Sequence, residues 1–172
     1  MEIGIYGLGK MGANMVRRLV RSGEHRVVAG NRSSGPVDQA VQDGAEGAYS
    51  MEDLVEKLSG SPRVIWTMVP AGDVTEQALL KFADMMDEGD ILIDGGNSYF
   101  RDSIRRAEML HEKGLRFLDA GTSGGIWGLE VGYCLMVGGD SDAYEHAEPA
   151  LKTLAPENGY LHTGGAGAGH FV

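Results

Sequence analysis

The sequence predicts an α/β fold: a doubly wound, mostly parallel sheet with helices on both faces, built as a single domain. Short apolar strand candidates alternate with helix-length amphipathic segments along nearly the whole chain. The run from 63 to 69 is apolar almost throughout, which is typical of a strand covered on both faces. A glycine-rich turn follows the first strand candidate and opens a helix, which is the arrangement of a Rossmann-type sheet.

Each element follows from a local pattern. The first helix is predicted from the helical spacing of Met11, Met15 and Leu19, with Arg18 and its neighbouring arginines facing outward and Gly23 as its end. The other predicted elements are strands at 2–6, 26–29, 63–69, 91–93, 117–118, 133–137 and 160–162, and helices at 36–43, 74–86, 102–113 and 143–154.

Two helices carry additional signals. Ser50 followed by Asp53 resembles a capping box at the start of a short helix. In the charged helix at 102–113, Ile104, Ala107 and Leu110 are expected to face inward.

Composition limits the class of protein. A chain of 172 residues with 42% hydrophobic and 23% charged residues is large enough for one domain with a sizeable core. No segment reaches the apolar length of a membrane span, and the N-terminus lacks a basic leader, so a cytoplasmic protein without membrane contact is expected. The net charge of −10 argues against nucleic-acid binding, and no metal ion is expected.

The single cysteine, Cys134, lies in an apolar run and has no partner for an internal disulfide. We expect it to fill space in the core, because a free cysteine behaves as a small apolar residue.

The glycine turn at residues 7–12 matches the G-x-G-x-x-G pattern in the context that the pattern requires. Gly7 allows the tight turn, Gly9 lets the backbone approach a pyrophosphate, and Gly12 lets the helix lie close to the sheet. The amides and partial positive charge at the helix start attract phosphates. The turn therefore predicts a dinucleotide site formed by Gly7, Leu8, Gly9, Lys10, Met11 and Gly12.

The end of the second strand bears on the choice of dinucleotide. The segment Asn31-Arg32-Ser33 has no acidic residue that would bind the adenine-ribose hydroxyls of NAD, and Arg32 can hold the 2′-phosphate of NADP. NADP is favoured on this ground. The alternative is that Arg32 is a solvated surface residue and that NAD binds through Asn31.

Two further glycine-rich segments close later strands, at 94–98 and at 121–125, and together they suggest the floor of an active site beside a nicotinamide pocket. Asn97 and Ser98 can instead be read as helix caps, and Asp94 is expected to fix its turn through its side chain. Val69, Pro70 and Ala71 are predicted to line the coenzyme groove, although Pro70 also suits a bare connection between strand and helix.

Six motifs in order give a family resemblance that spans essentially the whole chain. They are the fingerprint turn, Asn31-Arg32, M-V-P-A-G at 68–72, D-G-G-N-S at 94–98, G-T-S-G-G at 121–125 and G-A-G-H-F-V at 167–172. Together they resemble the N-terminal coenzyme-binding domain of 6-phosphogluconate dehydrogenase, closest to its shorter bacterial branch. The resemblance implies oxidation of 6-phosphogluconate at C3 and loss of C1 as carbon dioxide, yielding ribulose 5-phosphate, in gluconate utilization and the pentose phosphate pathway.

The resemblance also implies roles for single residues. Asn97 would contact both the substrate and the nicotinamide ribose, and Ser123, Gly124 and Gly125 would bind the carboxylate and hydroxyl end of the substrate. Such neutral donors hold a carboxylate without clamping it, which leaves it free to depart. The chain differs from longer members by having Ile126-Trp127 in place of an acidic pair, so no polar substrate contact is expected there.

The resemblance further implies groups that this sequence does not contain. The family's catalytic lysine follows G-H-F-V within K-M-V-H-N, a glutamate lies slightly further on, and a helical second domain supplies substrate-phosphate contacts and the dimer interface. The sequence stops at Val172 inside that motif, which suggests truncation in the laboratory. We expect it to bind dinucleotide without turnover and to form a homo-oligomer only in the complete protein.

Two other interpretations stay open. A 3-hydroxyisobutyrate-type dehydrogenase shares the fingerprint and a serine-glycine loop, but it tends to carry D-x-S-T and P-V-S-G-G where this chain has Asn97 and Thr122. A non-catalytic dinucleotide-sensing module would keep the fold and lack the acid-base groups.

Overall fold

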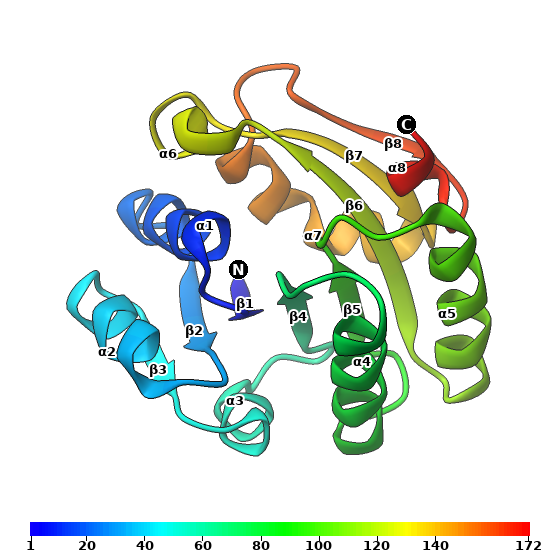
Figure 1. Cartoon of the computed structure of the whole chain (residues 1–172), viewed down its shortest axis with the longest axis horizontal. Helices are drawn as coiled ribbons and strands as arrows, with labels where there is room; N and C mark the ends of the chain where they lie inside the picture. Colours follow the sequence, from blue (N-terminus) through cyan, green and yellow to red (C-terminus); the bar gives the residue numbers. More distant parts are fainter.

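The computed structural model describes residues 1–172 and confirms the predicted fold class (Figure 1). One eight-stranded sheet has the order β3-β2-β1-β4-β5-β6-β7-β8, and every neighbouring pair is parallel except β6 with β7. The strands are β1 (Glu2–Tyr6), β2 (Arg26–Gly30), β3 (Glu46–Ala48), β4 (Val64–Thr67), β5 (Ile91–Asp94), β6 (Arg116–Ser123), β7 (Cys134–Gly139) and β8 (Tyr160–Gly164).

Helices cover both faces of this sheet. They are α1 (Lys10–Arg21), α2 (Ser34–Gln42), α3 (Met51–Lys57), α4 (Asp73–Met85), α5 (Phe100–Glu112), η1 (Gly125–Trp127), α6 (Gly128–Val131), α7 (Ser141–Leu154) and α8 (Ala168–Phe171). The central strands send alternate side chains to opposite faces of the sheet. Val64 and Trp66 therefore pack in one hydrophobic core with α1, α2 and α7, whereas Ile65 packs in a second core with α3, α4 and α5.

Most predicted elements are present, and the differences have local causes. β6 continues to Ser123 because it pairs with antiparallel β7 well beyond the two apolar residues that predicted it. The edge strand β3 and the short helices α6 and α8 gave no periodic signal, since each has only three or four residues. The Ser50 hydroxyl accepts a hydrogen bond from the Asp53 amide as a helix cap (3.0 Å).

Three burial expectations are wrong. Cys134 is exposed, because Tyr133 and Leu135 turn into the core and the alternation of β7 directs Cys134 to the opposite face. Ile104 is also exposed, and α5 buries Ser103 and Arg106 instead. Arg18 is half-buried, because its guanidinium donates hydrogen bonds to the Thr153 and Leu129 carbonyls rather than facing solvent.

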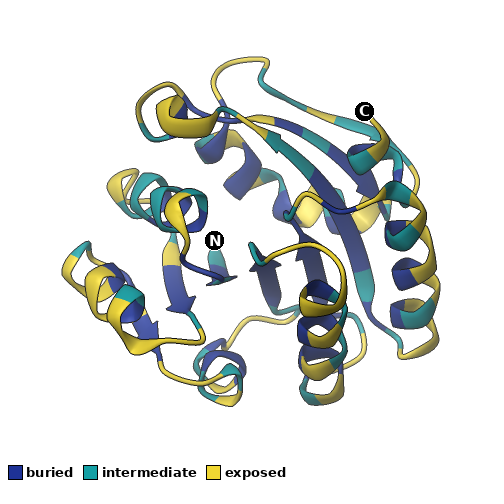
Figure 2. Ribbon diagram, in the orientation of Figure 1, coloured by how far each residue is buried: buried dark blue, intermediate teal, exposed yellow.

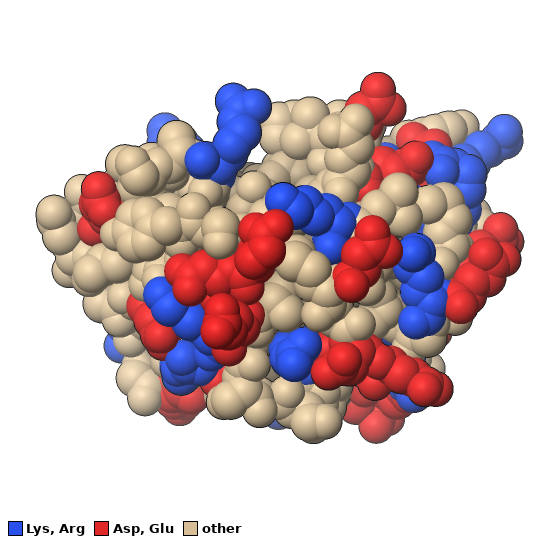
Figure 3. Space-filling view, turned by 90° about the horizontal axis from the view of Figure 1, so that it is seen from below, with Lys and Arg blue, Asp and Glu red and all other residues tan.

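The surface carries exposed apolar side chains, such as Leu161 of β8 and Phe171 of α8, among its polar groups. Figure 2 shows the central strands buried along their length, with exposure concentrated in loops and on outer helix faces. In Figure 3, acidic and basic groups are interspersed on the face that is drawn, without an extended basic surface. None of the helices has the length and apolar character needed to span a bilayer.

Candidate functional site

The glycine turn between β1 and α1 has a shape that only glycine permits at two of its positions. Gly7 has φ of +100°, and a Cβ there would lie 2.3 Å from the Met68 carbonyl oxygen. A Cβ on Gly12 would lie 2.0 Å from the Gly7 carbonyl oxygen, so α1 begins in direct contact with the turn. A Cβ on Gly9 would meet nothing within 4 Å, and the turn is therefore open at the position where a ligand would approach.

The start of α1 is available to an anion. Gly9 is its N-cap, no side chain caps the helix, and its first turn contains no acidic residue. The amides and the positive end of the helix dipole consequently have no internal anionic partner. This arrangement suits a phosphate group.

Asn31 and Arg32 have different environments at the end of β2. The Asn31 Oδ1 accepts a hydrogen bond from the Leu8 amide (2.9 Å), and its Nδ2 donates to the Ser33 hydroxyl (3.0 Å). The Asn31 side chain therefore connects the glycine turn to the loop at Ser33 by hydrogen bonds. Arg32 is exposed and forms neither an ion pair nor a hydrogen bond within the chain, so its guanidinium is free to bind a ligand anion.

A cavity of about 340 Å³ lies beside Ser61 and Arg116, at the amino ends of the strands, and another of about 550 Å³ lies in front of the glycine turn. The second is the candidate coenzyme site, because ligands of open parallel sheets bind at the carboxyl ends of the strands. Its lining consists of Tyr6, Gly7, Gly9, Asn31, Arg32, Ser33, Met51, Met68, Val69, Pro70, Val74, Gln77, Ala78 and Lys81.

This lining contains seven of the predicted coenzyme residues and some that sequence reasoning missed. Leu8, Lys10, Met11, Gly12, Ala71 and Asn97, which were also predicted, do not line the cavity. The missed residues include Val74, Gln77, Ala78 and Lys81, which lie on one face of α4 at spacings of three and four residues. That spacing is the only signal that could have found them, and it does not distinguish a ligand-facing surface from a core-facing one.

The loop after β5 is fixed by a buried carboxylate. Asp94 Oδ1 accepts a hydrogen bond from the Gly96 amide (3.0 Å), and Oδ2 accepts one from the Ser98 hydroxyl (2.6 Å). Burial raises the pKa of Asp94 above its ordinary value. These contacts agree with the expectation that the Asp94 side chain fixes its turn. The interpretation of Asn97 and Ser98 as helix caps is wrong, because Tyr99 is the N-cap of α5. Asn97 is exposed, and its side chain has no hydrogen bond within the chain.

The loops after β4 and β5 pack directly against each other. A Cβ on Gly95 would lie 2.0 Å from the Trp66 indole nitrogen, and one on Gly96 would lie 2.8 Å from the Val69 carbonyl oxygen. The two glycines thus allow the Asn97 loop to lie against the loop that lines the cavity.

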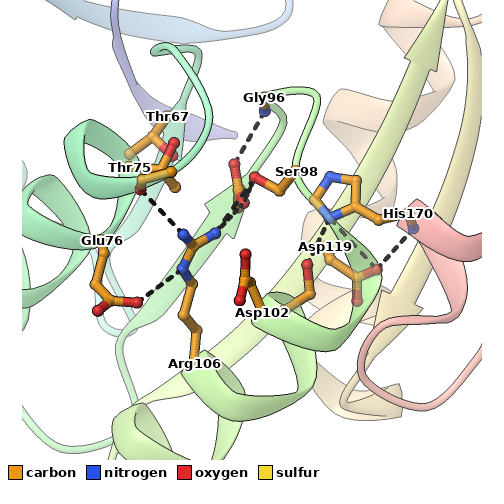
Figure 4. A network of polar contacts seen from close by, with 12 residues as sticks. Thr67, Thr75, Glu76, Gly96, Ser98, Asp102, Arg106, Asp119 and His170 are labelled. Atoms are coloured by element: carbon orange, nitrogen blue, oxygen red, sulfur yellow. Dashed lines mark hydrogen bonds and ion pairs between the residues drawn. The ribbon is translucent and has the colours of Figure 1, made fainter.

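Arg106 reaches both of these loops from α5, as Figure 4 shows. Its side chain is 3% exposed and donates hydrogen bonds to the Gly72 carbonyl (3.1 Å) and the Ser98 hydroxyl (3.3 Å). It also donates to Glu76 Oε1 at 3.3 Å and lies 3.6 Å from Asp94 Oδ2. Sequence reasoning missed this residue, because a single arginine in a charged helix carries no sign of burial.

Ser123 ends β6 at the same edge of the sheet as Asn97, since β5 and β6 are parallel neighbours. Its side chain is exposed and has no hydrogen bond within the chain. Gly124 has φ of +152° and lies against the ring of Tyr133. Ile126 and Trp127, which follow, are exposed. The structure therefore leaves the side chains of Asn97 and Ser123 without a hydrogen bond, and none of the predicted substrate residues lines the coenzyme cavity.

The glycine-rich C-terminal segment is held by a second buried carboxylate. Asp119 Oδ1 accepts a hydrogen bond from the Gly167 amide (2.8 Å), and Oδ2 accepts one from the His170 amide (2.9 Å). The His170 Nδ1 lies 2.7 Å from the Ser103 hydroxyl. These contacts attach α8 to β6 and α5.

Comparisons with known proteins agree with this geometry. Residues 2–164 match the family described as the NAD binding domain of 6-phosphogluconate dehydrogenase. Over 173 residues, the chain is 43% identical to an NAD(+)-dependent, decarboxylating 6-phosphogluconate dehydrogenase of Haloferax volcanii, and the match covers 100% of this chain and 56% of that protein. The chain spans about half the length of the curated relatives that it matches along its whole length.

Two solved structures share the fold. A 6-phosphogluconate dehydrogenase of Plasmodium falciparum superposes with a TM-score of 0.90 and 25% identity, over 99% of this chain and 38% of that one. A 3-hydroxyisobutyrate dehydrogenase of Mycobacterium tuberculosis gives a TM-score of 0.88 and 28% identity, over 99% and 56%. With the family match over nearly its whole length, the chain belongs to the NAD-binding domain family of 6-phosphogluconate dehydrogenase.

Proposed function

We propose that the complete protein oxidises 6-phosphogluconate and releases carbon dioxide to form ribulose 5-phosphate, with NADP as the hydride acceptor. Residues 1–172 form its coenzyme-binding domain in this proposal. The observation that carries it is the open cavity at the glycine turn, with unpartnered Asn97 and Ser123 at the ends of adjacent strands on the same edge of the sheet. The names of the matched relatives support the same reaction.

The residues at the cavity fit a dinucleotide. The open position at Gly9 and the uncapped start of α1 would hold the pyrophosphate, and Val69 and Pro70 would line the groove. When bound, the coenzyme supplies a nicotinamide ring that accepts hydride. Asn97 would orient the substrate and the ribose toward each other, which is the positioning on which hydride transfer depends.

The substrate carboxylate would be held by neutral donors of the loop at Ser123, Gly124 and Gly125. Glycine at positions 124 and 125 lets the backbone adopt left-handed geometry and approach a ligand closely. A neutral set of donors binds the carboxylate of C1 without a strong cation to retain it as carbon dioxide leaves. We place the acid-base groups and a helical second domain in the part of the relatives' length that this chain does not span.

Arg32 supports NADP as the coenzyme, because its guanidinium is free and lines the cavity while the Asn31 amide is engaged in bracing the turn. NAD is the second candidate, favoured by the name of the Haloferax volcanii relative. Titration of NADPH and NADH into the wild type and Arg32→Ala decides between them. For the phosphate role, we expect Arg32→Ala to weaken NADPH by about 10- to 100-fold, the equivalent of a charge-assisted hydrogen bond, and to leave NADH unchanged. An unchanged preference would refute it.

A 3-hydroxyisobutyrate-type activity is the alternative reaction, favoured by the similarity to the Mycobacterium tuberculosis structure. Assay of the complete protein with 6-phosphogluconate and with 3-hydroxyisobutyrate separates the two. We expect turnover only with 6-phosphogluconate. Binding of coenzyme without turnover of either substrate would support a sensing role instead.

A further inference from the structure

The buried guanidinium of Arg106 has no role in the proposed function, yet it lies between the two loops that carry that function. Its acceptor at Gly72 ends the loop whose Val69 and Pro70 line the coenzyme cavity. Its contacts with Ser98 and Asp94 belong to the loop that presents Asn97. One side chain therefore bonds both loops.

The contacts require the shape of an arginine. The three guanidinium nitrogens each have a different polar partner, Nε with Glu76, one terminal nitrogen with Ser98 and Asp94, and the other with Gly72. A planar guanidinium reaches such dispersed acceptors in fixed directions, whereas a lysine ammonium is a single point of charge on a flexible stem. The guanidinium thus contacts acceptors on both loops at once.

The neighbouring residue provides a matched comparison. Arg105 pairs with the same carboxylate, Glu76, at 2.7 Å and also contacts Asp102, but it is 48% exposed and bonds neither loop. Substitution of Arg105 therefore removes a neighbouring arginine that also pairs with Glu76, and it leaves the hydrogen bonds of Arg106 to Ser98 and Gly72 in place.

We propose that Arg106 is a positioning residue that fixes the Asn97 loop relative to the coenzyme loop and thereby sets the distance for hydride transfer. The inference rests on the proposed function. Arg106 does not touch the reacting atoms, and it acts through Ser98, Asp94 and the Gly72 carbonyl. A small displacement of a positioned reactant is sufficient to slow a reaction by about 100-fold.

The test uses the complete protein with Arg106→Lys, Arg106→Met, the charge-neutral pair Asp94→Asn with Arg106→Met, and Arg105→Met as the control. We expect kcat to fall by about 10- to 100-fold in the Arg106 variants and by less than about threefold in the control. With 6-phosphogluconate deuterated at C3, the isotope effect on kcat should rise in the Arg106 variants, because hydride transfer becomes slower than the steps around it.

The isotope effect separates positioning from a loss of folded protein, since a smaller active fraction lowers the rate and leaves the isotope effect unchanged. Hydrogen exchange of residues 69–72 and 94–97 gives a second readout, and we expect faster exchange in both loops for Arg106→Lys but not for Arg105→Met. Equal behaviour of Arg106→Lys and Arg105→Met in both measurements would overturn the proposal. Wild-type protein that fails to oxidise 6-phosphogluconate would refute the proposed function. The exchange measurement would still test whether Arg106 holds the two loops together.

Discussion

The two halves of the site are built by different physical means. The glycine turn after β1 is shaped by backbone contacts and by a neutral brace from Asn31. The loop after β5 is held instead by ionisable side chains without access to solvent, Asp94 and Arg106. A site shaped by backbone contacts can be recognised from glycine spacing, whereas a loop held by buried charges depends on partners distant in the sequence. The two halves should therefore respond differently to mutation.

The largest expected effect is a loss of folding stability when the buried charges after β5 are altered. Arg106→Met leaves the buried Asp94 carboxylate without its cation, and breaking a buried pair in this way costs about 3–5 kcal/mol of unfolding free energy. Arg105→Met removes an exposed pair and should cost no more than about 1 kcal/mol. Urea denaturation of both variants measures the difference. Equal losses would show that the buried pair has no special role in stability.

In the glycine turn after β1, substitutions at two positions are expected to affect fold stability and coenzyme binding differently. Gly12→Ala places a Cβ 2.0 Å from the Gly7 carbonyl oxygen and should destabilise the fold by about 1–3 kcal/mol through overpacking. Gly9→Ala meets no protein atom, so it should cost about 1 kcal/mol or less, the preference of an N-cap position for glycine over alanine.

Gly9→Ala should nevertheless weaken NADPH by about 10- to 100-fold, because the methyl group occupies the approach of the pyrophosphate. Thermal unfolding and fluorescence titration of the two variants give the comparison. Normal coenzyme affinity in Gly9→Ala would place the pyrophosphate elsewhere.

The smallest expected effect is a pH dependence of folding stability at Glu76, which pairs with Arg106. Hydrogen bonding from Arg105 lowers the pKa of Glu76 below its ordinary value of 4.5. A depressed folded-state pKa adds stability above pH 4.5 that is lost as the pH falls through the folded value. Because Glu76 is partly exposed, the wild type should lose under about 1 kcal/mol more than Glu76→Gln between pH 5 and 3. Parallel curves for the two proteins would contradict this pairing.

Residues that belong to a local sequence pattern were predictable. Gly7, Gly9 and Gly12 have the spacing of the fingerprint turn, and the alternation of apolar strand segments with amphipathic helices indicated the sheet. Residues whose role depends on packing were not. Arg106 reads as surface charge, and Cys134 reads as core although β7 turns it outward.

The lining of the coenzyme cavity was also not predictable, because it depends on packing between distant segments. Val74, Gln77 and Lys81 line it because α4 and the glycine turn, about 70 residues apart in the sequence, flank the same cavity. Asn97 and Ser123 were identified by family motifs, and the structure adds that both side chains are exposed and unpartnered. Their contacts with substrate stay a prediction.

The most direct measurement is a crystal structure of the complete protein with NADP and 6-phosphogluconate. We predict the pyrophosphate over Gly9 and the first turn of α1, the 2′-phosphate against Arg32, and the nicotinamide ring facing the substrate between Asn97 and Ser123. A pyrophosphate bound away from the glycine turn, or a substrate without contact to those two side chains, would contradict the account.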